Sequence, residues 1–151
     1  MNIVKKIDQY DENYVYFCDP IKNTIMNEGT FIRILYSTNT MVLNGIYLLI
    51  QLNDMTIEKY YNKAKYSFNI VIHKELIEKI RKIEENILKK ANVYNKSPLF
   101  KIYEQLQTGC IKLFNDTTQA QAKNNGLFIL KISGIWENNN NYGLTFKFMK
   151  A

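Results

Sequence analysis

Three lysines and three tyrosines are interleaved within eight residues near the middle of the chain. The segment is Lys59-Tyr60-Tyr61-Asn62-Lys63-Ala64-Lys65-Tyr66, and it lies at a predicted loop-to-strand junction where side chains can project. Lysine ammonium groups can follow the phosphates of an unpaired polynucleotide, while flat phenol rings can stack on its bases. The segment is therefore a candidate contact surface for single-stranded nucleic acid.

Further candidates lie on predicted strands and could extend a basic path from that segment. Each is set apart from its apolar neighbours by strand alternation, and the set comprises Arg33, Tyr36, Lys112, Lys131 and Lys147. Trp136 is a candidate platform for a base. A structural interpretation stands beside each of them. Lone strand lysines often only solvate a sheet face, and Tyr66, with one of Tyr60 and Tyr61, also suits packing in the core or at its rim.

The charge balance favours an anionic partner that is bound through its backbone. Twenty basic residues against 14 acidic ones give a net charge of +6. Only Arg33 and Arg81 are arginines. Because the planar guanidinium is best suited to bidentate contacts with base edges, the scarcity of arginine argues against sequence-specific recognition. A basic protein without such a partner is the alternative, since net charge alone separates the two poorly.

The residues needed for familiar kinds of catalysis are missing or isolated. His73 is the only histidine, which excludes clustered-histidine metal sites and leaves a nucleophile–histidine pair a single place to form. The glycines form no phosphate-binding loop. Carboxylate pairs such as Asp11–Glu12 and Glu84–Glu85 are typical of solvated surface. We therefore expect neither an enzyme nor a bound cofactor or metal.

Cysteine usage and hydropathy predict an intracellular protein. Cys18 and Cys110 are too few for a disulfide framework and indicate a reducing compartment. The N-terminal residues include lysines but no apolar signal-peptide core, and the longest apolar stretch is far shorter than the roughly 20 residues that cross a bilayer. We thus expect one domain of 151 residues that is not secreted and has no membrane partner.

Hydrophobic alternation predicts strands in the first half of the chain. We expect them at residues 13–18, 30–36, 40–52 and 65–72. Asn44 and Gly45 interrupt the longest of these runs. They form either a two-residue hairpin turn or a bulge that bends one strand.

Helical spacing replaces the alternation after residue 72. Apolar residues recur every three or four positions over 73–91, opposite a charged face, and predict an amphipathic helix that lies on a sheet. A second, shorter helix is predicted over 98–107, with Ser97 as its N-cap and Pro98 at its first position.

The last third returns to strands. We expect a short strand at residues 110–114, a polar mobile loop at 115–125, and a hairpin of strands at 126–136 and 142–149. In that hairpin Trp136 shares its predicted face with Phe128, Leu130 and Ile132. This favours core packing over base stacking for the indole ring.

Strands around a helical insert, with strands at both ends, predict a mainly β or α+β protein. The leading architecture is an antiparallel barrel of the oligonucleotide-binding (OB) type, with an inserted amphipathic helix and a second short helix. The long strand at 40–52, with its glycine bend, is suited to serve both halves of such a sheet. A two-layer α+β sandwich is the alternative.

The order of elements in the second half resembles that of a known family. The run Tyr66-Ser67-Phe68-Asn69-Ile70-Val71-Ile72 passes directly into the charged helix. The chain closes with Phe128-Ile129-Leu130-Lys131-Ile132-Ser133-Gly134-Ile135-Trp136, an asparagine turn, and Tyr142-Gly143-Leu144-Thr145-Phe146-Lys147-Phe148. This pattern is similar to that of the phage-type single-stranded-DNA-binding replication proteins of podophages, which have counterparts in nucleocytoplasmic large DNA viruses. The composition, rich in Asn, Lys, Ile and Tyr, is typical of AT-rich viral genomes of that kind.

The resemblance covers about residues 30–149 and implies an OB barrel that binds unpaired DNA without sequence choice. It maps the family's binding surface onto Arg33, Tyr36, Lys59, Tyr60, Lys63, Lys65 and Lys112. It also implies a non-catalytic role in viral DNA replication, repair or recombination, in the host cytoplasm or at a viral replication site. Further copies of the chain and other replication proteins would be its partners. The family's acidic C-terminal tail has no counterpart, since no acidic residue follows Glu137.

Two alternatives stay open at the level of sequence. The single-stranded partner could be RNA instead of DNA. The protein could instead be a viral structural or assembly protein whose tyrosine-rich strands contact other proteins.

Overall fold

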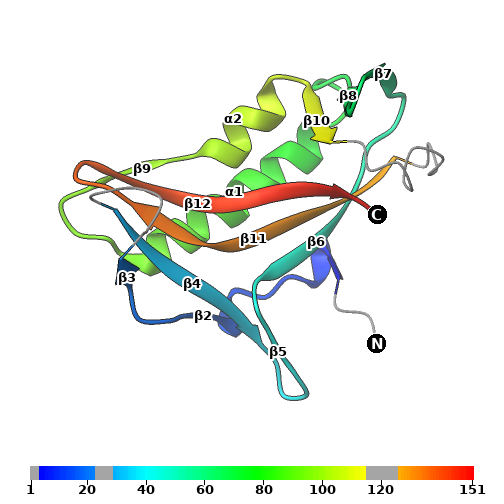
Figure 1. Cartoon of the computed structure of the whole chain (residues 1–151). Coiled ribbons are helices and arrows are strands. Elements are labelled where there is room, and N and C mark those ends of the chain that lie inside the picture. The colour runs from blue at the N-terminus through cyan, green and yellow to red at the C-terminus, as the bar shows by residue number, and fades with distance from the viewer. Residues whose placement is uncertain (1–3, 23–28, 115–125) are drawn as a thin grey trace.

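The computed structural model describes residues 4–22, 29–114 and 126–151, which form two β-sheets and two α-helices (Figure 1). The strands of the large sheet are β1 (Lys5–Lys6), β2 (Val15–Phe17), β3 (Ile21–Lys22), β4 (Thr30–Ser37), β5 (Val42–Leu43), β6 (Ile46–Gln51), β9 (Ser97–Leu99), β11 (Leu127–Glu137) and β12 (Asn141–Lys150). Those of the small sheet are β7 (Thr56–Tyr60), β8 (Lys63–Ser67) and β10 (Cys110–Phe114). The helices are α1 (Lys74–Ala91) and α2 (Lys101–Gln107), with the short 3-10 helices η1 (Ile7–Gln9) and η2 (Glu12–Tyr14). The predicted loop at 115–125 lies outside the described residues.

Strand β11 is the centre of the large sheet. It pairs antiparallel with β12 along one edge. Along the other edge it pairs antiparallel with β6 through residues 127–132 and with β4 through residues 134–137. The predicted hairpin of the last third is therefore confirmed.

The predicted strand at 40–52 is divided into β5 and β6. Asn44 and Gly45 form the bend between them. Gly45 has φ +131° there, and a Cβ on it would lie 2.9 Å from the carbonyl oxygen of Ile132. A side chain at this position would thus strain the backbone and push against β11.

One face of the large sheet carries the hydrophobic core. Leu48 and Ile50 of β6 and Phe128, Leu130 and Ile132 of β11 alternate along their strands and are 1% exposed or less. Figure 1 shows α1 and α2 on the same side of β11 and β12. Each such buried side chain contributes about 1.5–3 kcal/mol to folding, so this face holds the helices against the sheet.

Helix α1 confirms the amphipathic helix predicted over 73–91. Ile77, Ile80 and Ile87 recur at helical spacing and are buried. The helix ends at Asn92, which adopts a left-handed conformation with φ +51°. That conformation is common at helix C-termini, where asparagine tolerates it better than most residues.

Helix α2 begins three residues later than predicted. Ser97 and Pro98 belong to β9, which pairs parallel with the start of β12. The residue in the N-cap position, Phe100, offers no side-chain hydrogen bond. Glu84 of α1 takes over this role, because its carboxylate accepts hydrogen bonds from the backbone N–H groups of Ile102 and Tyr103 at 2.9 and 3.0 Å.

The small sheet has the order β10-β8-β7, with antiparallel pairing throughout. Its strand β10 confirms the prediction for residues 110–114. The strand predicted over 65–72 is wrong beyond Ser67. Asn69 explains the difference, since its side-chain oxygen accepts a hydrogen bond from the backbone N–H of Val71 at 2.8 Å and turns the chain toward α1.

The described chain is mainly β with two helices and agrees with the predicted α+β class. An OB-like closed barrel is not confirmed, because the strand order over the described residues runs from β1 to β9 without pairing of these two ends. No helix within the described ranges has the length and apolar character needed to span a membrane.

Candidate nucleic-acid interface

The predicted segment 59–66 is a β-hairpin, with residues of β7 and β8 on either side of a turn at Tyr61 and Asn62. Strand alternation sorts its side chains onto two faces. Tyr60, Lys63 and Lys65 lie on the outer face. The segment therefore does not present all its lysines and tyrosines together.

Tyr66 lies on the inner face of the hairpin and is 8% exposed. Its ring packs edge-on against Phe128, with the ring centroids 5.1 Å apart. Burial raises the pKa of its phenol. The alternative of core packing thus holds for Tyr66, and its candidacy for base stacking is corrected.

Strand β10 completes the outer face of the small sheet. Lys112 lies directly opposite Lys65 of β8, and Phe114 lies opposite Lys63. The ammonium of Lys63 is 5.4 Å from the centroid of the Phe114 ring, which is 74% exposed. We call this set, Tyr60, Lys63, Lys65, Lys112 and Phe114, the hairpin face.

Phe114 is the member of the hairpin face that the sequence prediction missed. It stands two residues after Lys112 in a short strand, so alternation alone places it on the same face. The alternation of this strand is therefore the sequence signal that identifies Phe114.

The outer face of the small sheet carries one carboxylate, Glu58, beside the lysines of the hairpin face. Neither Lys65 nor Lys112 forms an ion pair with any carboxylate of the described chain. Glu58, which lies across from Lys65 on β7, accepts a 2.5 Å hydrogen bond from the Tyr60 hydroxyl, and this bond raises the pKa of that phenol. Like charges directly opposite each other destabilise a sheet, so an anion bound here would relieve repulsion.

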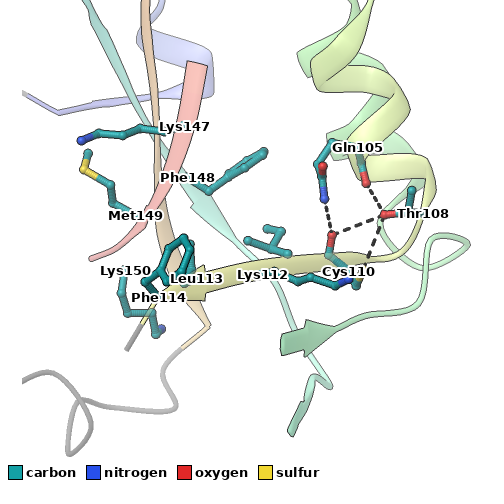
Figure 2. A pocket seen from close by; sticks show the side chains of 11 residues that line it. Gln105, Thr108, Cys110, Lys112, Leu113, Phe114, Lys147, Phe148, Met149 and Lys150 are labelled. Carbon is teal, nitrogen blue, oxygen red and sulfur yellow. Dashed lines mark hydrogen bonds between the residues drawn. The ribbon is translucent and has the colours of Figure 1, made fainter. Parts of the chain in front are cut away.

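A groove of about 890 Å³ separates the hairpin face from the end of β12. It is lined by Gln105 and Thr108 of the α2 end, by Cys110, Ile111, Lys112, Leu113 and Phe114, and by Lys147, Phe148, Met149 and Lys150. Figure 2 shows Lys147 and Met149 extending to one side of β12 and Phe148 to the other. The groove lining therefore brings three ammonium groups from two strands around one hollow, with no acidic residue among them.

Lys150 has a structural part in this groove. Its ammonium donates a hydrogen bond to the carbonyl of Leu127 at 3.1 Å and lies 4.6 Å from the centroid of the Phe128 ring. Burial lowers its pKa. The two lysines better placed to meet a ligand from solvent are Lys112 and Lys147, both of which are exposed.

Tyr36, like Tyr66, is buried, so its predicted role in ligand contact is wrong. It is 2% exposed, and its hydroxyl accepts a hydrogen bond from the backbone N–H of Asp11 at 3.1 Å. Its ring packs with those of Tyr10 and Tyr14, at centroid distances of 6.2 and 5.8 Å. The prediction failed because β4 turns Tyr36 to the core side, next to Ile34 in the alternation.

Trp136 does not share the core face of Phe128, and this prediction is wrong. The register between β11 and β12 shifts between Ile132 and Gly134, so one extra residue enters β11. Ile135 takes the inward position and is fully buried, while Trp136 moves to the opposite face and is partly exposed. Alternation counted through the bulge gives the wrong side for every later residue.

The remaining predicted residues fall in two places. Arg33, Lys131 and Lys147 lie with Trp136 on the face of the large sheet that points away from the helices. Lys59 is exposed on β7, on the inner side of the hairpin, and Tyr61 is fully exposed in the turn. The structure thus brings together Tyr60, Lys63, Lys65 and Lys112, and separates them from Arg33, Lys131 and Trp136.

His73 has a structural role. Its Nε2 accepts a hydrogen bond from the backbone N–H of Asn53 at 2.9 Å, and its Nδ1 donates to the carbonyl of Asn69 at 2.7 Å. Both ring nitrogens are occupied in joining the β6–β7 connection to the start of α1. Over the described ranges, no group of three or more His, Cys, Asp or Glu residues is arranged to hold a metal ion.

Comparison with known proteins returned no matching family model, no matching curated protein and no matching solved structure.

Proposed function

We propose that this protein binds single-stranded DNA without sequence preference. The hairpin face carries the proposal, because it places Lys63, Lys65 and Lys112 beside two exposed rings. A polynucleotide without a partner strand offers phosphates to cations and unstacked bases to aromatic faces at the same time. A surface that supplies both, and on which Lys65 and Lys112 form no ion pair with the described carboxylates, suits such a ligand.

The chemistry of the lysine side chains favours binding to the phosphate backbone of the nucleic acid. Lysine is a flexible point charge that can follow phosphates but seldom makes bidentate contacts with a base. All three cations of the hairpin face are lysines. We therefore expect sequence-tolerant binding with a marked dependence on salt.

The wider role is proposed on the same basis. A non-catalytic protein that covers unpaired DNA would serve viral replication, repair or recombination, inside the cell, with further copies of the chain beside it on the strand. An OB-like relationship belongs to this proposal. It is supported by the pairing of β11, which pairs with β6 along its first half and with β4 along its second half.

A charge-removal experiment tests the proposal. The double variant Lys65→Gln/Lys112→Gln should bind oligo-dT about tenfold or more weakly at 0.1 M salt, because each lost phosphate contact is worth roughly fivefold there. The matched control is Lys74→Gln/Lys82→Gln, which removes the same charge from the exposed side of α1.

The readout is fluorescence anisotropy with labelled oligo-dT, oligo-U and a duplex of equal length. We expect oligo-dT to bind more tightly than the duplex, and the control variant to bind like the wild type. A wild-type protein that binds no single strand, or whose affinity ignores salt, contradicts the proposal. A preference for oligo-U over oligo-dT would show that the ligand is RNA and not DNA.

A second candidate function is protein contact in a viral assembly. It is favoured by the turn before α1, where Ile70, Val71 and Ile72 are 37%, 75% and 55% exposed. Consecutive exposed aliphatic side chains are uncommon on a protein surface that has no partner. A Val71→Asp variant that loses concentration-dependent association in sedimentation, while oligo-dT binding stays intact, would support this function.

A further inference from the structure

The face of the large sheet that points away from the helices has an unusual composition. It consists of the outward-pointing residues of β4, β6, β11 and β12, among them Phe31, Arg33, Tyr47, Lys131, Trp136 and Lys147. We call this set the helix-free face. Its charged members are Arg33, Lys131 and Lys147, and none of its positions is acidic.

Two aromatic rings of this face lie over glycines. A Cβ on Gly134 would come within 2.4 Å of the Phe31 ring, and a Cβ on Gly143 within 2.8 Å of the Trp136 ring. The rings therefore occupy the space that side chains at these glycines would take. Each ring lies across a neighbouring strand and is partly exposed. An exposed ring lying along the sheet can stack on a base.

Phe31 and Trp136 are also direct cross-strand partners, on β4 and β11. Arg33 lies two residues further along β4, opposite Gly134. Its guanidinium forms no ion pair with a carboxylate of the described residues and donates a 3.1 Å hydrogen bond to the side-chain oxygen of Asn44. Two rings and a planar cation thus lie next to one another.

The second feature of this face is a pair of directly opposed lysines. Lys131 of β11 lies across from Lys147 of β12, and neither forms an ion pair with a described carboxylate. Tyr47 of β6 continues the same row, with the Lys131 ammonium 5.5 Å from its ring centroid. Opposed like charges cost stability in the free protein, and a bound anion removes that cost.

The two basic surfaces meet at the groove. Lys147 belongs to the helix-free face, Lys112 belongs to the hairpin face, and both line the same hollow. A ligand that leaves one surface through this groove reaches the other without crossing an acidic lining residue. The surfaces can therefore serve one continuous polyanion.

We infer that one single strand crosses both surfaces, from the hairpin face through the groove to the helix-free face, and stacks bases on Phe31 and Trp136. This inference rests on the proposed function and extends it to a second stacking platform. A second copy of the chain is the other occupant to consider for a sheet face. The charges favour the polynucleotide, because two helix-free faces brought together would oppose cations with cations.

Trp136 provides a direct readout, because it is the only tryptophan of the chain. Its fluorescence should be quenched when oligo-dT of roughly 15 nucleotides is added, a length within the range that single-strand binding folds cover. Phe31→Leu keeps apolar bulk over Gly134 but removes the ring, and it should weaken binding by about fivefold or more.

The second variant leaves the rings in place. Lys131→Gln/Lys147→Gln should lose most of the affinity that the wild type gains when the oligonucleotide is lengthened from roughly 6 to roughly 15 nucleotides. Lys74→Gln/Lys82→Gln on α1 is again the control. Circular dichroism and thermal unfolding confirm that each variant is folded before binding is compared.

The outcomes separate this inference from the proposed function. If the wild type binds oligo-dT and Lys65→Gln/Lys112→Gln weakens it, but Trp136 fluorescence and the Lys131/Lys147 variant are unaffected, the second platform is wrong and the function stands. If Phe31→Leu changes the sedimentation of the protein but not its affinity for oligo-dT, the face is a contact between copies and the inference is overturned. Absence of any binding by the wild type overturns both.

Discussion

Glu84 is the residue whose environment says most about how the two helices are held together. It is fully buried on α1, so the expectation that the Glu84–Glu85 pair is solvated is wrong for Glu84. Its carboxylate oxygens accept hydrogen bonds from the backbone N–H groups of Ile102 and Tyr103. These N–H groups open α2 and have no partner within their own helix. A single side chain therefore both satisfies the start of α2 and ties it to α1.

Removing this carboxylate should cost stability. Glu84→Ala leaves one buried and one part-buried donor unsatisfied, at about 1–3 kcal/mol each, so we expect the free energy of unfolding to fall by about 2–6 kcal/mol. Glu84→Gln keeps one acceptor oxygen and should lose less. Urea unfolding followed by circular dichroism measures both. Equal losses in the two variants would show that the one amide oxygen of glutamine does not replace the carboxylate, and would contradict the smaller loss expected for Glu84→Gln.

The ionisation of Glu84 predicts a dependence of stability on pH. Burial raises the pKa of its carboxyl above the ordinary value of 4.5, and the hydrogen bonds from Ile102 and Tyr103 oppose this only in part. The folded state then holds the proton more tightly than the unfolded state. Stability from this group is full below 4.5 and declines as the pH rises through the folded value.

Glu84→Gln isolates that contribution, because glutamine does not titrate. Between pH 4.5 and 7 the wild type should lose more unfolding free energy than Glu84→Gln does, each measured by urea unfolding at several pH values. Parallel pH profiles for the two proteins would contradict the prediction.

At this scale some of the residues singled out in the sequence lie together in the structure, and others lie elsewhere for physical reasons. Lys63, Lys65 and Lys112 do converge, because period-two alternation holds along short strands. Trp136 was put on the wrong side, because a bulge is a backbone irregularity with no unambiguous residue signal. The start of α2 was misplaced since its cap comes from Glu84, far upstream in the chain.

The hairpin of β7 and β8 has a strained turn residue within the proposed DNA contact surface. Tyr61 occupies its turn with φ +33° and is fully exposed, so its ring buries nothing within the described chain. A left-handed conformation favours glycine or asparagine and costs other residues about 1–2 kcal/mol. The ring of Tyr61 therefore adds little to folding and is accessible to the proposed ligand.

Replacing Tyr61 should separate stability from binding. Tyr61→Gly should leave the free energy of unfolding unchanged or raise it by up to about 1 kcal/mol, because strain is relieved while chain entropy is lost. Its affinity for oligo-dT should fall by about 1–3 kcal/mol if the ring stacks on a base. Thermal unfolding and anisotropy measure the two effects.

Tyr94 offers the matched control for this hairpin, as a tyrosine 84% exposed between α1 and β9. Tyr94→Ala should change neither quantity. A Tyr61→Gly protein that is destabilised by several kcal/mol would show that the ring does support the fold. One that binds oligo-dT as well as the wild type would remove the turn from the interface.

Elements with long periodic patterns were predicted well, and those decided by tertiary contacts were not. Helix α1 and the β11–β12 hairpin follow repeated apolar spacing over many residues, which is a strong local signal. The strand predicted over 65–72 ends early since Asn69 turns the backbone. The apolar residues that follow it were counted as strand, yet Val71 is 75% exposed.

Across the whole molecule, the net charge of +6 is not spread evenly. The ion pairs of the described chain gather mainly on α1, around Arg81 and Lys79. The lysines of the hairpin face and the helix-free face have none of these pairs. Helix α1 also carries more basic than acidic residues, but its Lys79 and Arg81 are paired with carboxylates, whereas the lysines of the two sheet surfaces are not paired within the described residues.

This separation makes the salt dependence of binding a test of the whole arrangement. For a single strand, the logarithm of the affinity falls with the logarithm of salt concentration by about 0.7 for each phosphate that a cation neutralises. Lys65→Gln/Lys112→Gln and Lys131→Gln/Lys147→Gln should each reduce the magnitude of that slope by about 1.4 on a long oligo-dT. The quadruple variant that combines both double substitutions should reduce the slope by about twice as much, because the two lysine pairs would contact different phosphates of one strand. Lys74→Gln/Lys82→Gln should leave the slope unaltered, although it lowers the net charge equally. If all double variants shift the slope by the same amount, binding responds to total charge, and the ordered path across the two sheets is excluded.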